Sequence, residues 1–272
     1  MRHVVIAVAA LMLGLLPACA QEEVSAQVLI AQAPAATQEE QTARVAMEMV
    51  MSGGGQDITI TADGGVDFTT QRAAMTMSMG EQMAAAGLGE ISMVTDGTII
   101  YMQLPNAEAL GVSTPWVKMD TETMPGMGGL GQLQQTGNDP TKSMEMLQGV
   151  SDDITEVGEE EIRGEPTTHY TATIDMDKAL EQVPEESRSF IQQQIDLLGT
   201  STLPVDVWID EEGRLRRQRM DIDTTGMAAG SPDAPAQIST TIDMYDFGAE
   251  VDTEPPPADQ VTDFADVQGL SG

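Results

Sequence analysis

The chain has 272 residues, a formal net charge of −32 at pH 7 and one cysteine. So strong a negative charge disfavours binding to nucleic acid through a general basic field, and a lone cysteine excludes an internal disulfide. The 20 methionines supply much of the apolar bulk, because aromatic residues make up only 3% of the chain.

The first 18 residues have the pattern of a secretory signal peptide. Arg2 supplies a positive charge, and the apolar run 4–16 is too short to span a membrane comfortably. Leu16-Pro17-Ala18-Cys19 resembles the lipobox of bacterial lipoproteins, although Pro17 departs from the commonest pattern. The resemblance implies cleavage before Cys19 and acylation of its thiol, which would anchor the chain at the extracytoplasmic face of the cell membrane. An ordinary signal peptide, with Cys19 as a small apolar residue, is the alternative.

Residues 19–41 are rich in Gln, Ala and Glu, which predicts a flexible tether with some helix near 24–31. Order is expected to begin at Thr42, where apolar and polar residues start to alternate as in strands. The predicted strands are 45–51, 56–62, 66–70, 72–79, 91–95, 98–104 and 116–120. Asp63-Gly64-Gly65 and Asp96-Gly97 are expected to form hairpin turns.

The second half of the chain predicts a helical insertion between further strands. A Gly- and Met-rich loop is expected at 121–139, followed by a helix to about Leu147. The remaining elements are strands at 153–160, 167–175, 203–210, 214–224 and 238–247, a turn at Gly164, and helices at 176–182 and 185–198. Residues 251–272 contain three consecutive prolines and predict an irregular surface tail. This order favours an α+β fold in which one strongly curved antiparallel sheet is covered by a few short helices.

The second half of the chain has a distinctive order of segments. A strand with Thr168-His169-Tyr170 comes first, and the helices follow. The hairpin that begins Leu203-Pro204-Val205-Asp206-Val207-Trp208-Ile209-Asp210 comes last. Together with the lipobox, this order resembles the LppX/LprG-like lipoproteins, which have a LolA/LolB-like half-barrel fold. The resemblance covers residues 42–250. It implies an apolar cavity that binds a lipid or glycolipid by its acyl chains, carriage or presentation of that ligand in the cell envelope, and an envelope transporter as a partner. It implies no cofactor.

A small helical lid over a concave sheet would leave apolar surface for such a ligand. Methionine is flexible and polarisable, so it adapts to mobile acyl chains. The residues expected to line the cavity are Met47, Met49, Ile58, Ile60, Met75, Met77 and Met93. Loops such as 121–139 would open for entry. Simple filling of a hydrophobic core is the alternative role for each of these side chains.

Two other functions compete with lipid binding. Met75, Met77 and Met79, with Met124 and Met127 nearby, could bind Cu(I) through soft thioethers. However, a half-buried strand gives the same alternation of methionine. An envelope lipoprotein with a structural or sensory role and a fully packed sheet is the other alternative.

Catalysis is not expected. His169 is the only histidine beyond the leader, and the chain has no nucleophile–base motif. A hydrogen-bonded ring on a strand is the expected role of His169, with Tyr170 on the opposite face. The acidic clusters at 152–153 and 159–161 have no calcium-loop spacing and predict a solvated surface. Arg214, Arg216, Arg217 and Arg219 are expected to neutralise neighbouring carboxylates, with contact to a phosphate headgroup as the alternative.

Overall fold

In the computed structural model, the described residues form one sheet of twelve strands. The structure describes residues 25–53, 57–80, 89–103, 112–120, 153–182, 198–224 and 236–267, with a few single residues and pairs between 84 and 196. The strand order is β12-β6-β5-β4-β3-β2-β1-β11-β10-β9-β8-β7. Only β12 and β6 are parallel neighbours; the other neighbouring pairs are antiparallel. The predicted α+β class with a curved antiparallel sheet is confirmed.

The described strands are β1 (Thr42–Ser52), β2 (Ile58–Asp67), β3 (Arg72–Ser78), β4 (Glu90–Asp96), β5 (Ile99–Gln103), β6 (Trp116–Asp120), β7 (Thr155–Ile162), β8 (Glu165–Asp175), β9 (Thr202–Asp210), β10 (Leu215–Asp223), β11 (Gln237–Tyr245) and β12 (Val261–Asp263). The described helices are α1 (Ala26–Gln38), α5 (Met176–Gln182), η3 (Ala258–Gln260) and η4 (Phe264–Asp266). None of the described helices is long and apolar enough to cross a membrane. The predicted loop at 121–139 lies outside the described residues, as does almost all of the predicted helix that ends near Leu147.

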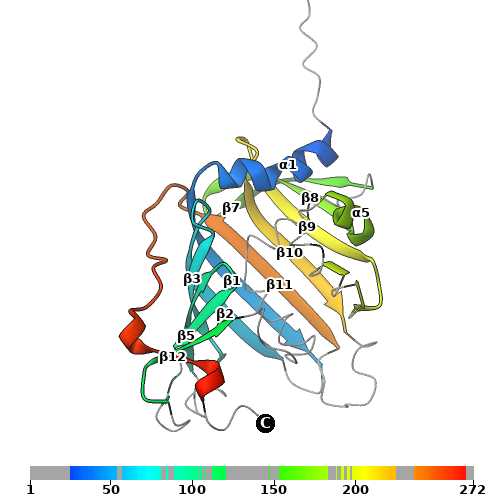
Figure 1. The fold of residues 1–272 in the computed structure, drawn as a ribbon. Helices are drawn as coiled ribbons and strands as arrows, with labels where there is room; N and C mark the ends of the chain where they lie inside the picture. The colour runs from blue at the N-terminus through cyan, green and yellow to red at the C-terminus, as the bar shows by residue number, and fades with distance from the viewer. Residues whose placement is uncertain are drawn as a thin grey trace, which may run out of the picture.

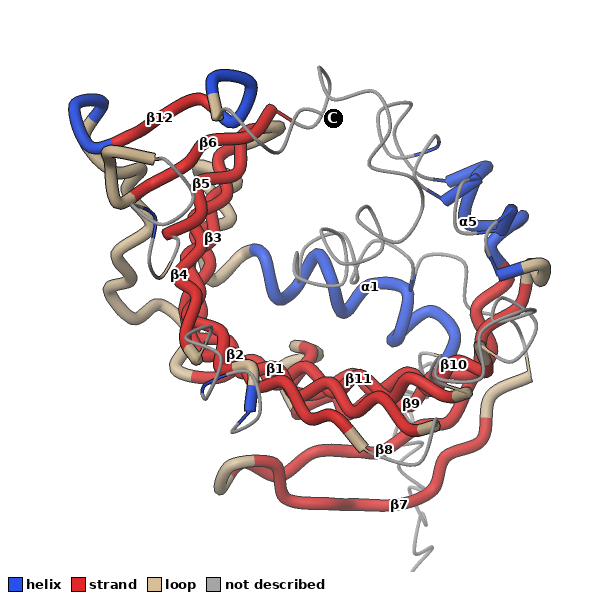
Figure 2. Tube along the Cα trace, turned by 90° about the horizontal axis from the view of Figure 1, so that it is seen from below, coloured by secondary structure: helices blue, strands red, loops and turns tan. Residues whose placement is uncertain are grey.

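The sheet bends into an open trough. Figure 2 looks along this trough and shows β3 to β6 rising as one wall from a floor formed by β2, β1, β11, β10 and β9. Helix α1 lies inside the trough and crosses it, and Figure 1 places α1 at one end of the long strands. The concave face therefore has one end that a helix covers.

Helix α1 corrects the prediction of a flexible tether, because residues 26–38 are helical and packed on the sheet. Ile30, Ala33, Pro34 and Thr37 are its buried residues. Their spacing of i, i+3, i+4 and i+7 is that of one helix face. The helix predicted near 24–31 is confirmed in part. Alanine, proline and threonine give only a weak apolar signal, so the sequence does not predict that the helix continues to Gln38.

One predicted turn is confirmed and another is wrong. Asp96 pairs with Ile99, which leaves Gly97 and Thr98 as the two-residue loop of a hairpin. By contrast, β2 runs straight through Gly64 and Gly65 to Asp67. A Cβ atom on Gly65 would lie 2.6 Å from the side chain of Val251, so this glycine is explained by the close approach of another segment.

That segment is the C-terminal strap, which we define as residues 248–257. It runs along the outer face of β2, β3 and β4 (Figures 1 and 2). Thr42 Oγ1 donates a hydrogen bond of 2.7 Å to the carbonyl oxygen of Ala249. Beyond the strap, β12 pairs with β6. The predicted irregular tail is therefore only partly right, because its end extends the sheet.

Candidate functional site: the concave face of the sheet

The residues predicted for a cavity share one face of the sheet. Residues directly opposite each other on antiparallel strands point to the same side. Met49 is opposite Ile60, and Met75 is opposite Met93. Together with the alternation along each strand, the register places Met47, Met49, Ile58, Ile60, Met75, Met77 and Met93 on this face. It is the concave face, since Met47 and Met75 belong to the same apolar cluster as Ile30 of α1. That these side chains contact a ligand stays a prediction.

Along β1 and β2, the exposure of side chains on this face rises with distance from the α1 end. Met47 is 4% exposed, whereas Met49, two residues farther along β1, is half-buried. On β2 the exposure is 1% at Ala62 and reaches 44% at Ile58 near the far end. On these two strands the apolar surface is thus fully packed at the α1 end and partly open at the far end, whereas Met75 and Met93 of the adjoining wall are only 5% exposed.

The other half of the concave face was missed by sequence reasoning. Its buried apolar residues come from β8, β9 and β11, and they are Tyr170, Ala172, Ile174, Leu203, Val205, Val207, Ile242 and Met244. Alternation of apolar residues along 203–207 was the available signal. It did not identify the cavity side because that requires the register between β9 and the strands beside it.

One polar side chain lies in the middle of this apolar face. Gln218 is opposite Val207 on β9 and opposite Ile242 on β11, and it is 2% exposed. Its Nε2 atom is buried and has no hydrogen-bond partner among the residues that the structure describes. A buried donor without a partner costs about 1–3 kcal/mol, so such an atom requires an explanation.

The covered end of the trough is held by charged groups as well as by packing. Asp210 Oδ2 accepts hydrogen bonds from Arg214 Nε at 2.9 Å and from Arg216 Nε at 2.7 Å. Arg214 also contacts Glu40, just beyond α1, at 3.0 Å. The backbone N–H of Leu215 donates a 2.9 Å bond to the buried Oγ1 of Thr37. These contacts join α1 to the β9–β10 hairpin.

The arginine cluster neutralises carboxylates, as the sequence predicts. Beyond the pairs of Arg214 and Arg216 with Asp210, Arg217 contacts Asp243 and Arg219 contacts Asp221. Among the described contacts, each of these guanidinium groups therefore has a carboxylate partner.

His169 has a hydrogen-bonded ring on the outer face, as expected. Its Nε2 is 2.9 Å from Asp206 Oδ1 and its Nδ1 is 3.1 Å from Glu160 Oε1. The ring stacks on Trp208 with centroids 4.1 Å apart. A hydrogen bond from the Trp208 indole, followed by the contact with His169, lowers the pKa of Glu160. Trp208 thus contacts both the Glu160 carboxylate and the His169 ring. Tyr170 lies in the apolar cluster of the opposite face, as expected.

In the part of the chain that the structure describes, no three His, Cys, Asp or Glu side chains are placed to hold a metal ion. Met124 and Met127, invoked for the copper alternative, lie outside the described residues, and so does Cys19.

The sequence is similar to two Streptomyces proteins, and no family model matches it. It is 27% identical, over 58% of its length, to an uncharacterised 31.2 kDa protein encoded between rplA and rplJ in Streptomyces griseus. It is 25% identical, over 79% of its length, to a Streptomyces coelicolor protein provisionally named a lipoprotein. The chain spans 50% and 61% of these two relatives.

The fold is similar to that of a solved lipoprotein. The crystal structure of Mycobacterium tuberculosis LppX matches 85% of this chain and 100% of its own length. The TM-score is 0.51 and the sequence identity is 19%. The chain therefore has the half-barrel fold of LppX.

Proposed function

We propose that this protein is an extracytoplasmic lipoprotein that binds a lipid or glycolipid on the concave face of its sheet and carries or presents it in the cell envelope. The observation that carries the proposal is the apolar surface from Met47 to Ile58, which is packed at one end and partly open at the other. Burial of acyl chains there would contribute about 0.8 kcal/mol per methylene.

The fold likeness to LppX, a lipoprotein by name, supports the class. The name of the Streptomyces coelicolor relative points the same way. In this proposal Cys19 carries the acyl anchor and an envelope transporter loads or receives the ligand. No bond is made or broken, so the protein acts as a carrier and not as an enzyme.

Gln218 suggests what kind of lipid is bound. Its Nε2 has no partner in the described part of the chain and lies among apolar neighbours, where a hydrocarbon chain could not satisfy it. A carbonyl oxygen of an ester or amide would accept its hydrogen bond. The proposed ligand is therefore an acylated lipid whose carbonyl group reaches the middle of the trough.

Gln218→Leu tests this ligand class, because leucine removes the unsatisfied donor while keeping a similar volume. We expect the variant to be at least as stable as the parent protein in urea unfolding. At the same time, a fluorescent diacylglycerol ester should bind about tenfold more weakly, while its ether-linked analogue should bind equally to both proteins. A lower free energy of unfolding for the variant would show that Gln218 has only a structural role. An equal decrease in affinity for the ester and the ether lipid would contradict carbonyl recognition.

Binding on the concave face itself is tested by a matched pair on β2. Ile60 and Thr61 are adjacent and point to opposite faces of the sheet. Ile60→Asp should abolish saturable binding of both ligands, since a carboxylate there would have to be desolvated by the acyl chains. Thr61→Asp should bind as the parent protein does. Equal binding by both variants would place the ligand elsewhere.

A further inference from the structure

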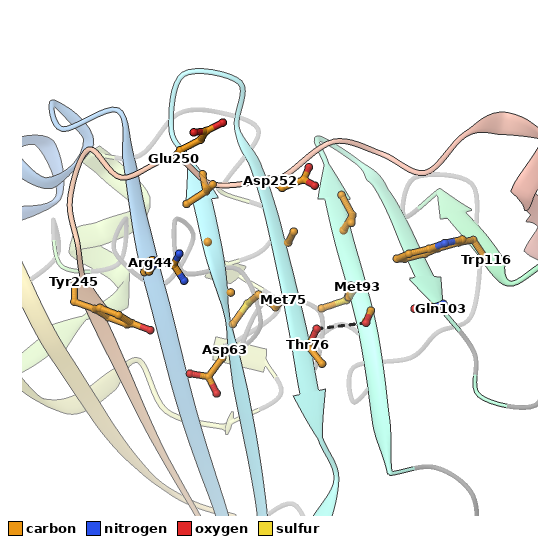
Figure 3. Close-up of a pocket in the computed structure, with 16 residues that line it drawn as sticks. Arg44, Asp63, Met75, Thr76, Met93, Gln103, Trp116, Tyr245, Glu250 and Asp252 are labelled. Atoms are coloured by element: carbon orange, nitrogen blue, oxygen red, sulfur yellow. Dashed lines mark hydrogen bonds between the residues drawn. The ribbon is translucent and has the colours of Figure 1, made fainter.

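A second candidate site lies on the outer face of the same sheet. The C-terminal strap crosses this face and leaves a groove of about 490 Å³ beside it (Figure 3). Side chains from β1 to β6, β11 and the strap line the groove, with Tyr245 towards one end and Trp116 at the other. Met75 and Met93 also border the groove (Figure 3). However, Thr76 and Ser92 alternate with them along β3 and β4, so the polar side chains of the groove point away from the proposed lipid surface.

Packing of the strap makes the groove a fixed feature. Val251 sits against Gly65, where any side chain would collide with it. The N–H of Gly248 donates a 2.9 Å hydrogen bond to the carbonyl of Thr42, and Thr253 is 6% exposed. Both ends of the strap are held, since β11 precedes it and β12 joins the sheet beyond it.

The floor of the groove carries one row of polar side chains that ends on an aromatic ring. The register places Asp63, Thr76, Ser92, Gln103 and Trp116 directly opposite one another on β2, β3, β4, β5 and β6. Thr76 and Ser92 join their hydroxyl groups at 3.3 Å. At about 4.8 Å between strands, the row is roughly 19 Å long. Each step is close to the length of one pyranose unit along a glycan chain.

The charge of the groove disfavours anionic ligands. Asp63, Glu250 and Asp252 contribute three carboxylates, and the one lining cation, Arg44, is 3.7 Å from Asp246 outside the groove. An anionic ligand would therefore be repelled. The centre of the row is uncharged and offers hydroxyl and amide groups, which suits a ligand with many hydroxyl groups better than a cation.

An extended peptide fits poorly for a separate reason. Peptides that add to sheets pair with a free strand edge. Here the floor consists of β2 to β5, and each of these strands is already paired on both sides. A ligand in this groove must cross the strands and be held by side chains alone.

We infer that the outer groove binds a neutral oligosaccharide of about four sugar units laid across β2 to β6. The C–H face of one sugar would stack on the half-buried Trp116 ring, as aromatic faces favour such contacts. Gln103, Ser92, Thr76 and Asp63 would bond the hydroxyl groups of the following units. This site does not depend on the proposed lipid function.

Titration of the full-length protein in detergent micelles tests the inference. The probes are neutral tetrasaccharides of glucose, mannose and N-acetylglucosamine in α and β linkage, followed by tryptophan fluorescence and saturation-transfer NMR. We expect saturable binding of at least one of them. Trp116→Ala should weaken it about tenfold, and Gln103→Ala, which changes an exposed side chain, about threefold to tenfold.

Thr61→Ala is the matched control, because Thr61 is exposed on the same face of β2 but outside the groove. Its affinity should equal that of the parent protein. The inference is overturned if no tetrasaccharide binds at millimolar concentration, if Gln103→Ala binds like Thr61→Ala, or if only a cationic probe such as tetralysine binds. Removal of lipid from the concave face should leave the sugar affinity unchanged.

Discussion

The two ends of the concave face have similar apolar side chains but very different packing. At the end that α1 covers, Ile30, Val45 and Met47 are at most 4% exposed. The Thr37–Leu215 hydrogen bond and the Glu40–Arg214 ion pair join the helix to the sheet. Towards the far end, Met49 is half-buried and Ile58 is 44% exposed. The difference suggests that the two ends have different roles: the covered end stabilises the fold, and the open end can bind a ligand.

The largest expected effect is at the buried charges of the covered end. Asp210→Ala should reduce the free energy of unfolding by about 3–5 kcal/mol, because it leaves the buried guanidinium of Arg216 without its carboxylate. Asp221→Ala is the control, since it breaks the more exposed pair with Arg219 and should cost at most about 1 kcal/mol. Urea unfolding measures both. If Asp210→Ala lowers the free energy of unfolding as little as Asp221→Ala does, the covered end does not depend on its buried charges.

A smaller effect is expected from a matched pair of methionines. Met47 and Met49 lie on the same strand and the same face, one buried and one half-buried. Met47→Ala should cost about 3 kcal/mol through the cavity that it leaves, whereas Met49→Ala should cost about 1 kcal/mol because less apolar area is removed from water on folding. Thermal and urea unfolding of the ligand-free protein measure the two values. Equal losses would mean that both ends are packed alike.

The smallest effect concerns the turn after β2, at the covered end. Thr69 Oγ1 and the N–H groups of Thr69 and Thr70 donate to the carboxylate of Asp67. These bonds, led by that of the Thr69 hydroxyl, lower the pKa of Asp67. The stabilisation is present above the pKa of the unfolded chain and is lost as pH falls through the lower pKa of the folded state.

Asp67→Asn should therefore cost about 0.5 kcal/mol at neutral pH. The difference from the parent protein should begin to shrink below about pH 4, the pKa of the unfolded carboxyl, and should vanish as pH falls through the lower pKa of the folded state, where Asp67 becomes neutral. Urea unfolding as a function of pH measures this. A constant difference across the acid range would show that the charge of Asp67 is irrelevant to the turn.

Most strands could be predicted because one face of each is buried and alternation reveals it. The seven candidate residues fall on one face for the same reason. Only the first part of helix α1, near 24–31, could be predicted from the sequence, since alanine, proline and threonine supply most of its buried stripe. Gly64 and Gly65 suggested a turn, although Gly65 instead makes room for Val251, nearly two hundred positions away along the chain.

The remaining features depend on strand neighbours that only the fold brings together. Gln218 is unusual because Val207 and Ile242 flank it across the sheet. The polar row of the outer groove collects one residue from each of five strands. No local pattern in the sequence marks either set.

Native mass spectrometry of the full-length protein, purified from its own host, tests the central claim most directly. Lipid binding on the concave face predicts adducts that organic solvent extracts and that contain ester or amide carbonyl groups. It also predicts that Ile60→Asp loses them while Thr61→Asp retains them. A bare polypeptide mass, unchanged after incubation with host lipid extract apart from the Cys19 anchor, would contradict the claim and favour a structural or sensory role.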